Sequence, residues 1–407
     1  MASRLIAFCT SGLALLAAHA ETPAAATPPP PVDVAFDLRY RYEGVDQTGT
    51  TESADANTLR LRARLVTRES AGFSGFLELD HVQGIGAERY NDTRNGLTEY
   101  PVVADPEGTD LNQAWLQYAA RPDTRLRLGR QRVNFDNQRF IGSVEWRQNE
   151  QTLDAIRIET TAFRGLALNY AYVDRVNRVF GPDAGTPPAT LDGSSHLLNA
   201  KLSPFAAGSI VAYAYLLDFD ESSQLSSRTI GARYEGSRDV RNGVSLGWAV
   251  EYARQRDAGD NPLDVNASYA QLELRLRVAE ADFNVGREIL SGEDGGVDPA
   301  SSRAFQTPLA TLHRWQGWAD KFLTTPPAGI RDTYVGGTFH RGRWRVQAVW
   351  HDFTADATSL RYGTEIDALA ALTFGKGPEL LVKYADYRAD GQFTDTRKLW
   401  AQISYSF

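Results

Sequence analysis

The chain has 407 residues, a formal net charge of −8 and 23% charged residues. This acidic balance argues against a nucleic acid partner, because nucleic acids are bound by basic surfaces. The single cysteine, Cys9, lies in an N-terminal leader, so the rest of the chain has no disulfide, thiolate metal ligand or cysteine nucleophile. No run approaches the roughly 18 consecutive apolar residues that a membrane-spanning helix requires.

Residues 1–20 have the features of a secretory signal peptide. A basic residue precedes an apolar stretch, and the small residues of Ala18-His19-Ala20 predict cleavage after Ala20. The stretch is too short for a membrane anchor. Residues 21–33 are rich in proline and alanine and are predicted to form an extended periplasmic tail. The folded part is expected to occupy residues 34–407.

Alternation of apolar and polar residues dominates the chain from residue 34 onward. Leu59 and Leu61 alternate with Arg60 and Arg62, and similar runs recur with turn residues between them. Aromatic residues on the apolar faces, Tyr213 and Tyr215 among them, are predicted to face lipid in interfacial girdles. The pattern predicts about eighteen β-strands, which begin near residues 34, 58, 73, 111, 124, 152, 166, 195, 209, 228, 243, 267, 281, 332, 343, 361, 379 and 397.

The connections between these strands alternate between short turns and mostly long, polar loops. Short turns include 161–165 and 375–378, and the longest loops are 83–110 and 291–331. A soluble β-sandwich would show the same alternation within its strands. The two classes of connection, the length and the leader instead favour an all-β fold, a transmembrane antiparallel up-and-down β-barrel with both termini in the periplasm. About eighteen strands would enclose an aqueous channel.

The C-terminal strand alternates Leu399, Ile403, Tyr405 and Phe407 with polar residues. A chain that ends in such a strand with a terminal aromatic residue resembles the bacterial outer-membrane β-barrels. The resemblance implies a location in the bacterial outer membrane and contact with its lipid and lipopolysaccharide. It also implies that the barrel-assembly machinery recognises Phe407.

Several motifs resemble the alginate-export family of eighteen-stranded outer-membrane barrels. They are Leu128-Gly129-Arg130-Gln131-Arg132, Asn137-Gln138-Arg139-Phe140, Trp146-Arg147-Gln148-Asn149, the segment from Phe305 to His313, and Gly317-Trp318-Ala319-Asp320-Lys321-Phe322. The resemblance implies an anion-selective, porin-like conduit for an acidic polysaccharide or related solutes. The alginate-exporting member has a long periplasmic turn between its sixteenth and seventeenth strands, where this chain has only Gly375-Lys376-Gly377-Pro378. A gated exporter and a simpler diffusion channel therefore both remain open.

Basic side chains are the main chemical feature of the predicted lumen. Guanidinium groups match carboxylates and stay charged, so a ring of arginines in a narrow pore selects anions. The densest group lies on the first two strands. The alternative is that these residues pair with lumen acids as a ladder that stabilises the wall. Strand parity predicts the following pore-lining, substrate-binding residues: Arg39, Arg41, Arg60, Arg62, Arg64, Arg125, Arg127, Arg157, Arg233, Arg275, Arg277, Arg345 and Lys383.

The loop 291–331 is predicted to contain a short amphipathic helix. Thr307 suits the N-cap and Pro308 the first helical position. The helix could pack on the barrel mouth or fold inward and act as a gate. The candidate loop or gate residues are Thr307, Pro308, Leu312, His313, Trp318, Asp320 and Phe322. The acidic loop 83–110 has no regular ligand spacing, so a solvated loop is favoured there over a site for a hard cation.

Three functions follow from these patterns. The first is a channel for anionic saccharides or related small anionic solutes, and the second is a general diffusion porin without strong anion selectivity. The third is a structural or adhesive barrel that acts through its extracellular loops. The sequence contains no G-x-S-x-G, H-E-x-x-H or P-loop pattern, so we expect neither an enzyme nor a bound metal or cofactor. The oligomeric state is left open.

Overall fold

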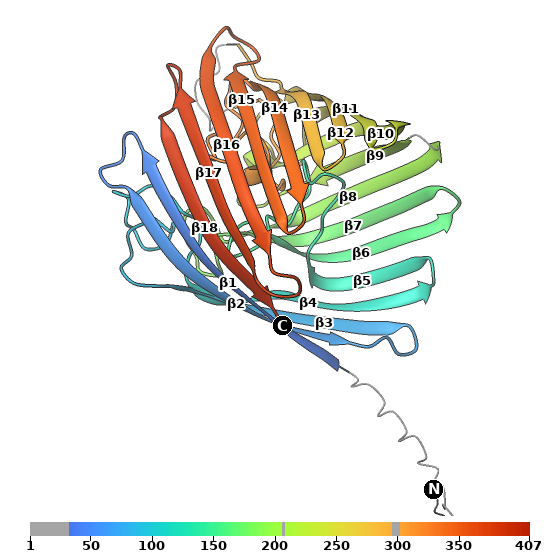
Figure 1. Ribbon diagram of the computed structural model, residues 1–407. Coiled ribbons are helices and arrows are strands. Elements are labelled where there is room, and N and C mark those ends of the chain that lie inside the picture. The colour runs from blue at the N-terminus through green and yellow to red at the C-terminus, as the bar shows by residue number, and fades with distance from the viewer. Residues whose placement is uncertain (1–31, 206–207, 295–301) are drawn as a thin grey trace, which may run out of the picture. The chain divides into compact units, whose positions relative to one another are not determined.

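The computed structural model describes residues 32–205, 208–294 and 302–407. The strands in these ranges form one 18-stranded antiparallel sheet. The sheet closes on itself, because β1 pairs with both β2 and β18 and β9 pairs with β10 (Figure 1). The predicted closed barrel is therefore confirmed. The predicted signal peptide and nearly all of the tail lie outside the described residues.

The strands have the following bounds: β1 Val32–Gln47, β2 Ala54–Thr67, β3 Phe73–Gly84, β4 Gly108–Arg121, β5 Thr124–Gln131, β6 Thr152–Phe163, β7 Leu166–Asn177, β8 Thr190–Phe205, β9 Gly208–Leu217, β10 Ser227–Arg241, β11 Val244–Asp257, β12 Asn266–Val278, β13 Ala281–Leu290, β14 Ile330–Arg341, β15 Trp344–Thr354, β16 Arg361–Thr373, β17 Glu379–Ala389 and β18 Thr396–Ser406. Two short 3₁₀ helices, η1 Ser223–Leu225 and η3 Leu312–Arg314, lie in the connections. Among the described residues there is no helix that is long and apolar enough to cross a membrane.

The largest differences from the predicted strand starts are at β2 and β8. β2 begins at Ala54 rather than 58, and β8 begins at Thr190 rather than 195. The ladder between β1 and β2 continues as far as the pair Val45 and Ala54. At the start of β2 the alternation reverses: Ala54 and Ala56 lie on the buried face, and Asp55 and Asn57 lie on the face of Leu59. Backbone pairing thus persists beyond the lipid-facing stretch, and the strand start predicted from side chains comes too late.

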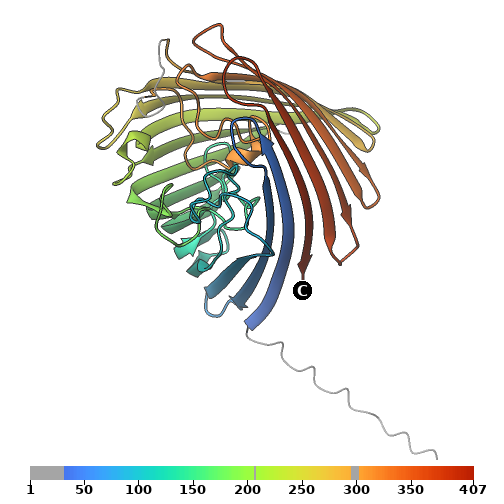
Figure 2. The same ribbon diagram turned by 90° about the vertical axis from the view of Figure 1, so that its left-hand side faces the viewer.

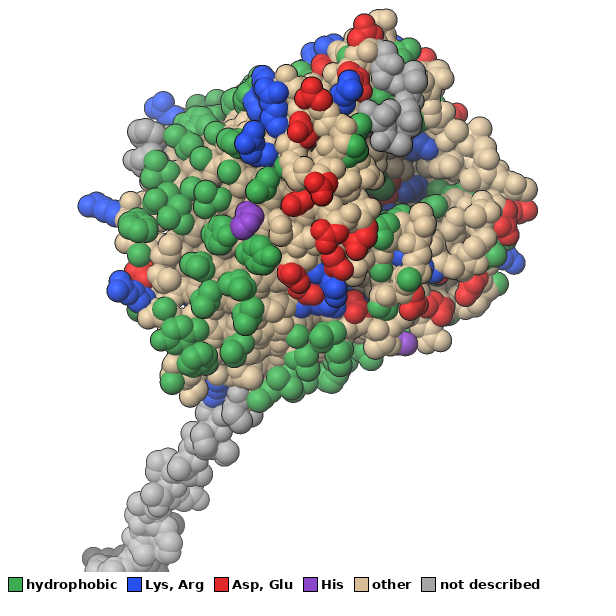
Figure 3. All heavy atoms as spheres, turned by 180° about the vertical axis from the view of Figure 1, so that it is seen from behind, with side chains coloured by type: hydrophobic (Ala, Val, Ile, Leu, Met, Phe, Trp, Pro, Cys, Tyr) green, Lys and Arg blue, Asp and Glu red, His purple; other side chains and the backbone are tan. Residues whose placement is uncertain are grey.

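The two faces of the barrel wall have the polarity of a membrane barrel with a polar interior. Leu61, Leu116 and Leu272 are exposed on the outside, whereas Arg60, Gln113 and Gln271 are buried inside. Figure 3 shows hydrophobic side chains spread over much of the outer surface. Moving one such side chain from water into lipid is worth about 1.5–3 kcal/mol, so this outer face favours a hydrocarbon environment.

The predicted lipid contact of Tyr213 and Tyr215 is wrong. Their exposed fractions are 4% and 3%, and the Tyr213 hydroxyl donates a hydrogen bond of 2.9 Å to Glu251 in the lumen. Ile210 and Leu216 occupy the outer face of β9 instead. Both faces of this strand are apolar, so the alternation in sequence could not say which face meets lipid.

Two long connections fold into the barrel (Figure 2). Loop A is residues 132–151 between β5 and β6, and loop B is residues 302–329 before β14. They contact each other, because Gly142 donates its N–H to the Leu309 carbonyl at 2.9 Å and Thr311 donates to the Gln138 carbonyl at 3.1 Å. The motifs that carry the family resemblance therefore meet in space.

The predicted amphipathic helix in loop B does not form. The only helical turn there within the described residues is η3, and the Thr307 hydroxyl accepts a hydrogen bond from Arg139 instead of capping a helix. Gln316, Gly317 and Asp320 have positive φ angles, which a right-handed helix does not permit. Long-range partners satisfy the backbone of loop B and remove the need for helical hydrogen bonds.

Phe407 lies where the barrel closes, and the residue is 60% exposed. Its backbone exchanges two hydrogen bonds with Phe36, and the two rings stack at 5.6 Å. We predict that deletion of Phe407 lowers the amount of barrel in the outer membrane without changing the fold of the molecules that assemble. Outer-membrane levels and the heat-dependent gel shift of the deletion variant measure this. Normal levels would contradict the prediction.

Candidate pore constriction

Two of the cavities in the interior lie against loops A and B. The inner cavity has a volume of about 630 Å³ and is lined in part by residues next to the short turns, such as Arg345 and Glu379. The outer cavity has a volume of about 500 Å³ and reaches long connections such as the one that contains Arg178. His313 lines both cavities. The layer around His313 is therefore the candidate constriction of the pore.

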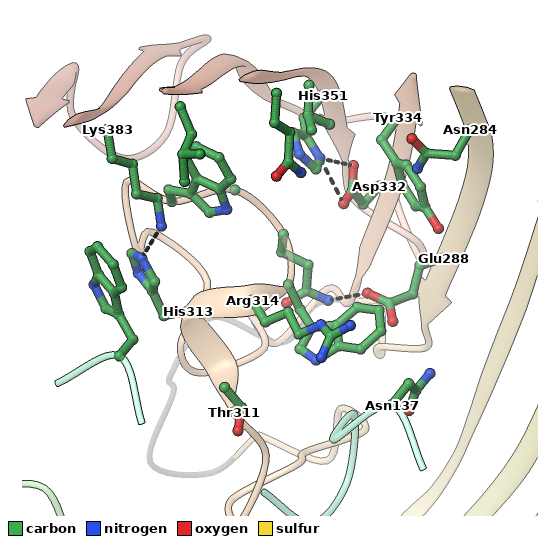
Figure 4. Close-up of a pocket in the computed structure, with 18 of the residues that line it drawn as sticks. Asn137, Asn284, Glu288, Thr311, His313, Arg314, Asp332, Tyr334, His351 and Lys383 are labelled. Carbon is green, nitrogen blue, oxygen red and sulfur yellow. Dashed lines mark hydrogen bonds and ion pairs between the residues drawn. The ribbon is translucent and has the colours of Figure 1, made fainter. Parts of the chain in front are cut away.

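His313 is the centre of a buried charge network. Its Nε2 lies 2.5 Å from the Lys383 ammonium, and its Nδ1 lies 2.6 Å from Asp320 (Figure 4 shows the first contact). Asp320 also contacts Lys398 at 2.7 Å and Arg147 at 3.1 Å. A neutral imidazole fits this geometry, because Nε2 can accept from Lys383 while Nδ1–H donates to Asp320. Burial lowers the pKa of His313 well below its usual value, which keeps the ring neutral.

Three indole rings surround the Lys383 ammonium. Its Nζ lies 3.8 Å from the ring centre of Trp318, 4.1 Å from that of Trp146 and 5.2 Å from that of Trp400. The His313 ring stacks on Trp146 at 5.0 Å. Trp146 belongs to loop A and Trp318 to loop B, so cation–π attraction to one wall residue holds both loops across the lumen.

The first-strand arginines hold the backbone of loop A. Arg39 donates hydrogen bonds to the carbonyl groups of Glu145 at 3.1 Å and Arg147 at 3.2 Å. Arg41 donates to the carbonyl of Trp146 and places its guanidinium 4.1 Å from the centre of the indole ring. These guanidinium groups are engaged by loop A and do not stand free in the channel.

The arginines of the second strand also contact loop A. Arg60 donates to the Gln148 carbonyl at 3.3 Å and pairs with Asp37 at 2.6 Å. Arg62 pairs with Glu150 at 2.6 Å, and it binds Asp80 in a bidentate fashion through two 2.6 Å bonds. We call Arg39, Arg41, Arg60 and Arg62 the arginine clamp. Arg60 and Arg62 have the cross-strand acids that the wall-ladder alternative expects, whereas Arg39 and Arg41 are bound mainly by loop A.

Two buried carboxylates, one in loop A and one in loop B, are held ionised. Burial alone would raise the pKa of Glu150, but Arg62, Arg132 and Arg60 outweigh it and lower the pKa from 4.5 to about 2. Burial opposes ionisation of Asp320 in the same way, and His313 and Lys398 still bring its pKa well below the usual value. Both carboxylates thus remain charged at neutral pH.

This network predicts how the constriction responds to pH. A carboxylate whose folded-state pKa is lowered stabilises the closed loops above its unfolded-state pKa, and this stabilisation disappears as the pH falls through the folded-state value. We therefore expect the contribution of Glu150 to holding loop A to be constant from neutral pH down to about 4.5, so that conductance controlled by loop A rises only as the pH approaches about 2. Conductance of single channels in a pH series measures this. A rise near pH 6 would contradict it and would indicate control by a histidine.

Loop B is fixed to the opposite wall by two buried carboxylates. Ala319 donates its N–H to Glu365 at 2.7 Å, and Trp318 donates its N–H to Asp367 at 3.2 Å. Gly317 has a φ of +82°, and a Cβ atom there would overlap the Glu365 carboxylate. This explains why glycine precedes Trp318 in the motif.

The other gate candidates also lie inside the barrel. Phe322 packs between Phe353, at 4.7 Å, and Tyr362, at 5.8 Å, while Pro308 and Leu312 line the outer cavity. Thr307 contacts Arg139, which pairs with Glu288 at 2.6 Å. Of the two positions left open by the sequence for this segment, the inward-folded one is observed.

The remaining predicted pore residues face the lumen but do not form one ring. Their placement is as follows: Arg64 lies 3.6 Å from Glu78, Arg127 stacks 4.1 Å from the Trp115 ring, Arg157 pairs with Glu159 at 2.7 Å, Arg233 with Glu251 at 2.9 Å, Arg275 with Glu273, and Arg277 with Asp282 at 2.6 Å, while Arg125 is exposed and Arg345 and Lys383 line the inner cavity. Most of these cations are thus neutralised by a neighbour on the wall.

Two guanidinium groups in the inner cavity differ from the rest. Within the described residues, neither Arg314 nor Arg345 has a carboxylate within 4.0 Å or a hydrogen-bond partner for its side chain. Both line the inner cavity, which Trp315 and Trp318 also line, and Figure 4 shows Arg314 among the lining side chains. Arg314 follows His313 in η3 and was not predicted as a site residue, because loop residues have no strand parity from which to read an orientation.

Sequence reasoning also missed Asp105, Glu150 and the role of Arg147. Asp105 is fully buried and contacts Arg41 at 3.4 Å, so this part of the acidic loop 83–110 is not solvated as expected. Arg147 stands in a motif noted for its family resemblance, which was the available signal. No group of three or more His, Cys, Asp or Glu residues suited to a metal occurs within the described residues.

Comparison with known proteins agrees with this architecture. A family model described as alginate export matches residues 31–188. The crystal structure of OccK9 (OpdG) of Pseudomonas aeruginosa superposes with a TM-score of 0.74 at 15% identity, covering 92% of this chain and 98% of that chain. OccAB4 of Acinetobacter baumannii gives 0.74 at 12% identity with the same coverage. At such identities the likeness concerns the fold. A comparison with curated protein sequences finds no match.

Proposed function

We propose that this protein, a bacterial outer-membrane channel of the alginate-export type, passes anionic saccharides or related small anionic solutes through a constricted lumen. One observation carries the proposal. Arg314 and Arg345 line the inner cavity without a carboxylate within 4.0 Å among the described residues, so their charge is available to a passing anion. The arginine clamp, by contrast, serves to position loop A.

The aromatic lining of the inner cavity supports a saccharide. Trp146, Trp315 and Trp318 line it, and the buried indole N–H groups of Trp146 and Trp315 have no hydrogen-bond partner among the described residues. An indole ring can pack against the apolar face of a sugar ring. A guanidinium group nearby can pair with a uronate carboxylate in a bidentate fashion.

The test is electrical. For the purified barrel in a planar bilayer under a salt gradient, we expect a reversal potential with the sign of an anion-selective channel. Digalacturonate should reduce its conductance, and maltose, a neutral sugar of similar size, should not. A reversal potential near zero with equal effects of both sugars would identify a general diffusion porin. Absence of conductance would favour a structural or adhesive barrel.

A further inference from the structure

The outer cavity has a different chemical character from the inner one. Twelve of the 22 residues that line it are apolar, among them Val102, Phe180, Leu312 and Leu323. Only six of the 26 inner-cavity residues are Trp, Val or Leu, and most of the others are polar or charged. A polyhydroxylated sugar would lose hydrogen bonds to water against the apolar outer wall, so the two cavities suit different ligands.

The charges of the outer cavity are also unbalanced. Its charged lining residues are Arg147, Arg178, Lys321, Lys398 and a single carboxylate, Asp320. The inner cavity has five cations and four carboxylates: Arg233, Arg275, Arg314, Arg345 and Lys383 against Glu273, Glu288, Asp332 and Glu379. Because Asp320 is shared by Arg147 and Lys398, it does not neutralise the other two cations of the outer cavity.

Arg178 and Lys321 have only uncharged partners among the described residues. Arg178 donates to the Pro188 carbonyl at 3.1 Å and lies 4.6 Å from the Phe180 ring centre. Lys321 donates to the hydroxyl groups of Thr394 and Thr396, both at 3.0 Å. Burial, followed by the charge of Lys398, lowers the pKa of Lys321 to about 8, so its ammonium is charged at neutral pH.

We propose that the outer cavity binds an organic carboxylate with an apolar body, such as an aryl carboxylate. The carboxylate pairs with Arg178 and Lys321, and the apolar body lies against Phe180, Leu312 and Leu323. The ligand displaces water from apolar surface and meets two cations that no wall carboxylate compensates. This site lies on the side of the long loops and stands independently of the selectivity of the inner cavity.

Isothermal titration of the purified full barrel in detergent with 2-naphthoate tests this site. We expect saturable binding of 2-naphthoate, and binding of 2-naphthamide or glucuronate that is weaker by on the order of tenfold, because each lacks one of the two required features. The Arg178→Gln/Lys321→Gln variant should weaken naphthoate binding by a similar factor. Arg397→Gln, which removes an exposed cation paired with Asp46 outside the cavity, should leave the affinity unchanged.

A further variant and two comparisons of titration curves test the proposal independently of the double variant. Leu312→Asn removes part of the apolar wall and should also weaken naphthoate binding, even if the double variant fails to assemble. Equal titration curves for naphthoate and naphthamide would show partition into detergent or apolar surface and would overturn the proposal. Loss of naphthoate binding in Arg314→Gln/Arg345→Gln, with retention in Arg178→Gln/Lys321→Gln, would place the ligand in the inner cavity and would equally overturn it.

Discussion

Replacement of Arg39, Arg41 and Arg60 by glutamine is expected to increase single-channel conductance severalfold and to increase current noise. The three guanidinium groups donate to four main-chain carbonyl groups of loop A. Hydrogen bonds that involve a charged group contribute about 1.5–3 kcal/mol each. Without them, and with Asp105 and Glu150 short of a partner, loop A should leave the lumen for part of the time. The barrel ladder, which does not depend on these side chains, should remain closed.

The control for this variant is Arg397→Gln, which also removes a cation but outside the lumen. The single variant Arg39→Gln is informative as well, because Arg39 has no carboxylate within 4.0 Å among the described residues and its loss leaves no buried acid unpaired. It should produce a smaller increase in conductance. Unchanged conductance together with a reversal potential shifted toward cations would show that these arginines are selectivity sites, as strand parity first suggested.

Replacement of Arg314 and Arg345 by glutamine is expected to move the reversal potential toward cations while the conductance changes little. The inner cavity would then have three cations against four carboxylates, where the native cavity has five against four. The formal charge of the lining becomes more negative by two, and a more negative cavity holds fewer anions. Block by digalacturonate should weaken in the same variant.

The measurement is best made at low ionic strength, because at 0.1 M salt the screening length is about 10 Å and part of the effect would be lost. Arg397→Gln again provides the matched control, and its reversal potential should equal that of the native protein. An unchanged reversal potential in Arg314→Gln/Arg345→Gln would remove the main support for an anion conduit. The result would not bear on the outer cavity, whose ligand is tested by direct binding.

The barrel itself could be predicted from the sequence because its signal is local. Alternation of side chains along one strand, as in Leu59 to Arg62, states which residues face lipid and which face the lumen without reference to any other segment. The alternation of short turns and long loops likewise indicates from the sequence that neighbouring strands are consecutive in the chain. The prediction failed at Tyr213 and Tyr215, where both faces of β9 are apolar and the local signal carries no direction.

The state of the lumen was decided only by the tertiary structure. The sequence placed the arginines of β1 and β2 on the inner face, but Arg39 meets the Glu145 carbonyl across 106 residues of chain, and Arg62 meets Glu150 across 88. Loop B lacks its predicted helix because the acceptors for its N–H groups lie on β16 and in loop A. The period of a strand determines whether a side chain points to lipid or to the lumen. The partner of that side chain depends on which distant loop lies in front of it. This partner decides whether a cation in the lumen stabilises the fold or remains available to an anion.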